Sequence, residues 1–118
     1  MEFEIRFYKD DKGKSPIEEF LIGLVESNRV LVSKTRQSIE KLRIRVFHKE
    51  PLSKYLEAGL WELRVKSGSD ILRIIYTFRK GQVIILLHIF IKKKQKTPTG
   101  ELEIARKRLQ EIKVREAN

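Results

Sequence analysis

Three consecutive runs of strand-forming residues constrain the fold more than any other part of the chain. The first run, Leu60–Lys66, alternates apolar and charged residues, and the second, Ile71–Phe78, alternates the directions of its side chains. The third, Val83–Ile91, is almost continuously apolar, as expected of a strand that is covered on both faces. Two short glycine-containing segments of hairpin length separate the runs: Ser67–Asp70 and Lys80–Gln82. We therefore predict an antiparallel meander of three strands.

The N-terminal part of the chain predicts one more strand and two helices. Glu2–Tyr8 alternates apolar and polar residues, which is typical of a short half-buried strand. The segment Ser15–Glu18 then begins a helix, because serine can cap the free N–H groups, proline suits the first helical position and glutamate can complete a capping box. After a break at Ser27–Asn28 we expect a second helix to about Phe47. Its buried positions have near-helical spacing: Val32, Ile39, Leu42 and Val46.

The remaining segments complete the expected order of elements. The residues from His48 to Leu56 contain Pro51 and are expected to be irregular. A last helix is predicted over roughly Gly100–Val114. The predicted order is β-α-α-β-β-β-α in a single domain over residues 1–118, which is an α+β arrangement with helices packed on one sheet.

Composition restricts the kinds of partner and site. The net charge of +10 and the pI of about 10.0 favour a polyanionic partner. Three kinds of partner are open: nucleic acid, an acidic membrane surface and an acidic protein. The chain has no cysteine, and its histidines and carboxylates lack the spacing of metal ligands, so we expect no metal and no other cofactor. We expect no signal peptide after Met1, and Val83–Ile91 is too short to cross a bilayer as a helix. We therefore expect a cytoplasmic protein without membrane attachment.

Three segments together resemble a known family. Gly59–Gly68 (GLWELRVKSG), Arg73–Tyr76 (RIIY) and Leu86–Pro98 (LLHIFIKKKQKTP) are similar to the HigB-like, phage-associated branch of the RelE/ParE toxin superfamily. The resemblance implies a microbial-RNase-like fold with helices packed on a twisted, mainly antiparallel sheet. It also implies the toxin of a type II toxin–antitoxin system, which cleaves messenger RNA on the ribosome. The implied partners are messenger RNA, ribosomal RNA and a HigA-like helix-turn-helix antitoxin.

Metal-free RNA cleavage by 2′-OH attack needs a base, an acid and cations that stabilise the phosphorane-like transition state. Relatives are described as using mainly Lys, Arg and Tyr. The resemblance implies that Arg64 and Arg73, on neighbouring strands, clamp the scissile phosphate, since a guanidinium group matches phosphate oxygens. Two alternatives are a structural ion pair of Arg73 with Glu62 or Asp70 and a solvated position for Arg64.

A cluster of lysines follows the third strand of the meander. By matched position, Lys92 and Lys93 are candidates for phosphate binding or for the general acid. Other candidates for RNA contact are Lys66, Phe90, Lys94 and Lys96. Such a run of charge is also a common solvated strand edge that prevents aggregation. Some relatives carry a tyrosine just past this cluster, whereas this chain has Lys96–Thr99 without an aromatic residue, so the general base stays open.

Four further residues combine a reactive or stacking group with an apolar setting. His88 lies within the apolar strand, where a lone histidine is more often a hydrogen-bonded core residue than a catalyst. His48 has only its residue type in favour of a role. Tyr76 is expected to pack in the core with a hydrogen-bonded hydroxyl, and Trp61 is expected to anchor the core, although it could stack an RNA base.

The sequence thus favours a ribosome-dependent endoribonuclease toxin. Two other functions are open: a ParE-like toxin that poisons DNA gyrase without cutting nucleic acid, and a non-catalytic basic module that binds nucleic acid or an acidic partner. A role at a membrane surface is disfavoured, because Glu18 and Glu19 give the first helix the wrong charge for an anionic bilayer.

Overall fold

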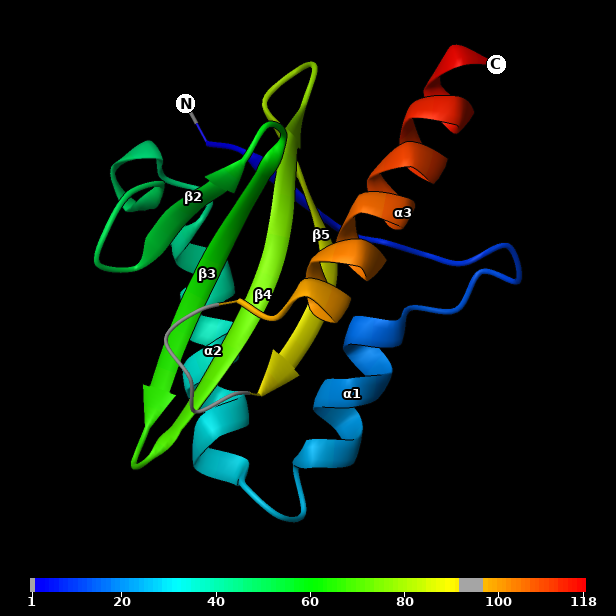
Figure 1. The fold of residues 1–118 in the computed structure, drawn as a ribbon. Coiled ribbons are helices and arrows are strands. Elements are labelled where there is room, and N and C mark those ends of the chain that lie inside the picture. The colour runs from blue at the N-terminus through cyan, green and yellow to red at the C-terminus, as the bar shows by residue number, and fades with distance from the viewer. Residues whose placement is uncertain (1, 92–96) are drawn as a thin grey trace.

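A mixed five-stranded sheet forms the centre of the computed structural model, which describes residues 2–91 and 97–118. Helices α1 and α2 cover one face of this sheet and α3 covers the other (Figure 1). The strands lie in the order β1-β5-β4-β3-β2, and all neighbours are antiparallel except β1, which pairs parallel with β5. The elements are β1 (Glu4–Phe7), α1 (Pro16–Leu24), α2 (Arg29–Lys41), the 3₁₀ helix η1 (Arg45–Phe47), β2 (Ser53–Glu57), β3 (Leu60–Ser67), β4 (Asp70–Arg79), β5 (Val83–Ile91) and α3 (Thr99–Ala117).

The predicted α+β class and the three-stranded meander are confirmed. Gly68 and Gly81 lie in the two hairpin turns with φ of 61° and 84°, where an L side chain would be strained. A third turn, between β2 and β3, contains Gly59 with φ of 83°, and a Cβ at this position would lie 3.1 Å from Leu109 of α3. The turn residues therefore set both the hairpins and the close approach of α3.

Alternation along the strands divides the interior into two cores. The core under α1 and α2 holds apolar residues of β3 and β4, among them Leu63, Val65, Leu72, Ile74 and Tyr76. On the other face α3 buries three residues at helical spacing: Ala105, Leu109 and Ile112. The interior strand β5 is almost entirely apolar, and both of its faces are covered, as its sequence predicts.

The start of the first helix agrees with the predicted capping residue. Ser15 Oγ accepts a hydrogen bond of 3.2 Å from the Glu18 backbone N–H, so serine caps α1 as expected. The Glu18 carboxylate forms an ion pair with Arg36 of α2. In α2, Asn28 Oδ1 accepts from the Leu31 N–H at 3.1 Å. Side-chain caps thus define where both helices begin, while Glu18 joins one helix to the other.

Three sequence predictions about the end of α2 and the region after it are wrong. The second helix ends at Lys41 rather than near Phe47, because Ile44 adopts an extended backbone conformation. Val46, predicted to be buried, is therefore 57% exposed. The segment expected to be irregular contains the start of β2, a short edge strand that pairs antiparallel with β3. No helix within residues 2–91 and 97–118 is long and apolar enough to cross a membrane.

Candidate functional site

The two arginines predicted to bind phosphate lie directly opposite each other in the sheet. Arg64 of β3 pairs with Arg73 of β4, and Arg73 pairs on its other side with Phe90 of β5. These residues alternate with the apolar residues that face α1 and α2, so the row lies on the α3 face. The predicted proximity of Arg64 and Arg73 is therefore present in the fold.

Glu62 joins the two arginines into one ion-pair cluster. Arg64 Nε donates to Glu62 Oε1 at 2.9 Å, and Arg73 Nη1 lies 3.7 Å from Glu62 Oε2. Thr97, just before α3, donates its hydroxyl hydrogen to Glu62 Oε2 at 2.6 Å. Since the Glu62 side chain has no exposed surface, its charge depends on these partners.

Access to solvent distinguishes the two guanidinium groups. Arg64 is 21% exposed, whereas Arg73 is 1% exposed. The alternative considered from sequence, an ion pair of Arg73 with Glu62, is therefore present in this conformation. Arg64 can contact a phosphate at the surface if the phosphate replaces Glu62 as its partner. Arg73 can contact a phosphate only if the residues that bury it move. Their catalytic roles stay predictions.

The other predicted RNA-binding residues are placed less closely together. Lys66 is exposed at the end of β3, on the same face as Arg64. Phe90 is 5% exposed and stacks on His88 with ring centres 5.6 Å apart, so its ring belongs to the core under α3 in this conformation. The four predicted lysines lie outside the described residues: Lys92, Lys93, Lys94 and Lys96.

His88 connects β5 to α3 through polar contacts. Its Nε2 lies 2.7 Å from Glu101 Oε1, and its Nδ1 lies 3.4 Å from Arg108 Nη1. Burial lowers the pKa of His88, although the hydrogen bond with Glu101 opposes this shift. The histidine thus has the hydrogen-bonded core position expected from sequence, and it fixes the first turns of α3.

His48 and Tyr76 also have structural contacts. His48 Nε2 lies 2.6 Å from the Leu42 carbonyl oxygen, which ties the segment after α2 to the end of that helix. Tyr76 is fully buried and donates its hydroxyl hydrogen to Ser53 Oγ at 2.8 Å. Burial raises the pKa of Tyr76 to about 12. The predicted core role of Tyr76 is confirmed.

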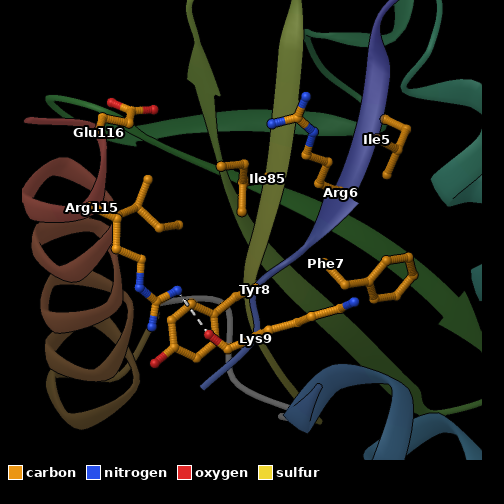
Figure 2. Close-up of a pocket in the computed structure, with 9 residues that line it drawn as sticks. Ile5, Arg6, Phe7, Tyr8, Lys9, Ile85, Arg115 and Glu116 are labelled. Carbon is orange, nitrogen blue, oxygen red and sulfur yellow. Dashed lines mark hydrogen bonds between the residues drawn. The ribbon is translucent and has the colours of Figure 1, made fainter. Parts of the chain in front are cut away.

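A separate hollow of about 580 Å³ lies between β1 and the C-terminal half of α3 (Figure 2). Arg115 lies over the Tyr8 ring, 5.5 Å from its centre, and donates to the Lys9 carbonyl oxygen at 2.9 Å. Glu116, at the same hollow, forms an ion pair with Arg79. These groups satisfy one another, and neither Arg64 nor Arg73 lines this hollow.

Sequence reasoning did not identify the shared role of Glu62 or the contact of Thr97. Alternation could have indicated the first, because Glu62 and Arg64 are two residues apart on one strand and so lie on one face. The second joins segments 35 residues apart in the chain, and no local pattern reveals such a contact.

Comparison with known proteins gives one family. The family model described as phage derived protein Gp49-like (DUF891) matches residues 20–110, from within α1 to within α3. This match covers the arginine pair, Glu62 and the segment that carries the lysine cluster. No curated protein matches the chain.

Proposed function

Because this chain belongs to the phage-derived Gp49-like family, a family of RelE/HigB-like toxins, we propose that it is a type II toxin that cleaves messenger RNA on the ribosome. A toxin of this kind implies an antitoxin partner. The proposed antitoxin is a small helix-turn-helix protein that neutralises the toxin, and the proposed place of action is the cytoplasm, where ribosomes translate.

The direct register between Arg64 and Arg73 carries the mechanistic part of the proposal. Two guanidinium groups on adjacent strands can bind two oxygens of one phosphodiester and stabilise the additional negative charge that forms as the 2′-OH attacks. Glu62 holds these groups together in the absence of RNA. A bound scissile phosphate would replace the Glu62 carboxylate as the partner of both arginines. Lys92 or Lys93 is proposed for proton transfer to the departing 5′ oxygen.

Cleavage of a translated messenger RNA, mapped by primer extension in a cell-free translation system, tests the proposal. The Arg64→Gln and Arg73→Lys variants should each cleave about 10²–10³-fold more slowly, since removal of one transition-state donor commonly has that effect. Lys34→Gln, which changes an exposed cation on α2, is the matched control and should cleave like the unchanged protein. Circular dichroism would establish that each variant is folded.

Three outcomes would contradict this function. Intact transcripts with normal translation, after synthesis of the protein is verified, would exclude the endoribonuclease. DNA-damage signalling with intact transcripts would instead favour a gyrase-poisoning toxin of the ParE kind. If RNA binds but is not cleaved, and Arg64→Gln does not change the binding, the chain would be a non-catalytic binding module.

A further inference from the structure

A hollow on the sheet face opposite the arginine pair combines aromatic rings with cations. Its volume is about 470 Å³, and it lies where α2 has ended and no longer covers β3 and β4. The ring residues Trp61, Phe78 and His48 and the cations Arg45 and Lys49 are among those that line it. Neither the proposed cleavage nor the core explains why these two kinds of side chain meet here.

The rings of the hollow form a connected cluster that is partly open to solvent. Trp61 and Phe78 meet edge to face with centres 4.7 Å apart, and His48 meets Phe78 at 4.9 Å. Trp61, Phe78 and His48 are each only half-buried. Partly exposed aromatic rings held in place by their neighbours can stack on the unpaired bases of single-stranded nucleic acid.

Of the three cations that line the hollow, Arg79 pairs with Glu116, whereas Arg45 and Lys49 are not neutralised by carboxylates of the described residues. Arg45 and Lys49 are exposed, and within residues 2–91 and 97–118 neither forms an ion pair. Arg45 lies over the Phe3 ring, 5.4 Å from its centre, so the aromatic cluster orients this guanidinium group. By contrast, Arg36 and Arg43 of the α2 region are each paired with a glutamate. The hollow therefore offers positive charge directly beside stacking surfaces.

We propose that this hollow binds an unpaired base of single-stranded RNA, with Trp61 contacting the base and with Arg45 and Lys49 contacting the flanking phosphates. The inference rests on the proposed function only in the choice of RNA as ligand. Binding at this hollow requires neither the arginine pair nor cleavage. An acidic peptide would satisfy the cations but would not use the rings, which is why the structure favours RNA.

The edge strand β2 connects the hollow with the α3 face. In the register of β2 with β3, Lys54 lies beside Glu62 and Tyr55 lies beside Trp61. Lys54 is exposed and lies on the α3 face, whereas Tyr55 is 57% exposed and meets Trp61 edge to face at 5.4 Å. An RNA strand that passes over this edge would thus find a cation on one side and an aromatic ring on the other.

Trp61 is the only tryptophan of the chain, so its fluorescence reports on the hollow directly. The probe is a short single-stranded RNA with 2′-O-methyl groups, which cannot be cleaved by 2′-OH attack, so a failure of cleavage does not affect the measurement. Stacking predicts a saturable quench of Trp61. Inorganic polyphosphate and an acidic peptide of equal charge should leave the fluorescence nearly unchanged.

Two matched double variants, measured by anisotropy of labelled RNA, locate the phosphate contacts. Arg45→Gln/Lys49→Gln should weaken binding about tenfold at low salt. Arg29→Gln/Lys34→Gln removes the same charge from exposed positions in the N-terminal half of α2 and should weaken binding less than about twofold. Equal effects of the two double variants would overturn the proposal.

A ring variant tests the stacking itself. Trp61→Leu should weaken the binding of labelled RNA at least about fivefold, because stacking of one base on an aromatic side chain contributes at least that much. If Trp61→Leu does not fold, the fluorescence quench and the two double variants alone test the proposal. Binding of RNA without any change in Trp61 fluorescence, or an equal quench by polyphosphate or by the acidic peptide, would overturn the proposal.

Discussion

Glu62 carries its charge without any exposed surface, so the stability of the protein depends on the cations around it. We expect Glu62→Gln to lower the free energy of unfolding by about 3–5 kcal/mol, because loss of one member of a buried ion pair leaves the remaining charge poorly compensated. Urea denaturation measures this change. Glu26→Gln, at an exposed position without an ion pair among the described residues, is the control and should change stability by less than about 0.5 kcal/mol. A similar result for both variants would contradict the structural role of Glu62.

Tyr76 gives the protein a specific sensitivity to alkali. Burial raises the pKa of its hydroxyl to about 12 in the folded state, from 10.0 when exposed. The unfolded chain therefore loses this proton first as the pH rises, and stability falls between these two values. We expect Tyr76→Phe to be less stable near neutral pH by about 1 kcal/mol, through loss of the bond to Ser53, but to decline less above about pH 10. Denaturation curves at several pH values would refute this if both proteins decline equally.

At the scale of elements, the docking of α3 on β5 contains an acid-sensitive contact. Because burial lowers the pKa of His88, the unfolded state takes up a proton before the folded state does as the pH falls. The bonded carboxylate of Glu101 reduces this difference and Arg108 increases it. We expect stability to fall as the pH drops below about 6.5, and His88→Gln to reduce that fall. Urea midpoints over this range test it, and parallel pH profiles would contradict it.

The elements that sequence predicted correctly have strong local signals. The meander was predictable because turn glycines separate runs with period-two alternation, and the start of α1 was predictable because Ser15 is a good cap. The segment Ser53–Glu57 is short and mostly polar, so it forms a strand only because β3 offers a free edge. The parallel pairing of β1 with β5 joins residues far apart in the chain, and no local pattern determines it.

The candidate site was predictable in part, because the register of its two strands also depends on a strong local signal. A hairpin with a short turn determines its register, so the proximity of Arg64 and Arg73 follows from two adjacent strands. The cations of the second hollow could not be predicted, because Arg45 and Lys49 follow an early helix end that carries no glycine or proline. Their meeting with Trp61 depends on the packing of the segment after α2 against the edge of the sheet.

At the scale of the whole molecule, charge and contact act on different steps of RNA binding. The chain carries 26 Lys and Arg residues against 16 Asp and Glu residues, and several of its glutamates are engaged in ion pairs. In the proposed binding of RNA, this surplus of positive charge would attract the RNA from a distance, and salt would screen the attraction. In the proposed complex, local contacts in the hollow would instead oppose dissociation of the bound strand.

This difference predicts distinct kinetics for the two double variants, measured by stopped-flow detection of Trp61 fluorescence. Arg29→Gln/Lys34→Gln should lower only the association rate, by less than about twofold at about 50 mM salt, and this effect should vanish near 500 mM, where charges are screened within a few ångströms. Arg45→Gln/Lys49→Gln should raise the dissociation rate several-fold at both salt concentrations, since its contacts are made in the bound state. Dissociation rates that are the same for the two variants would mean that the hollow contributes charge alone.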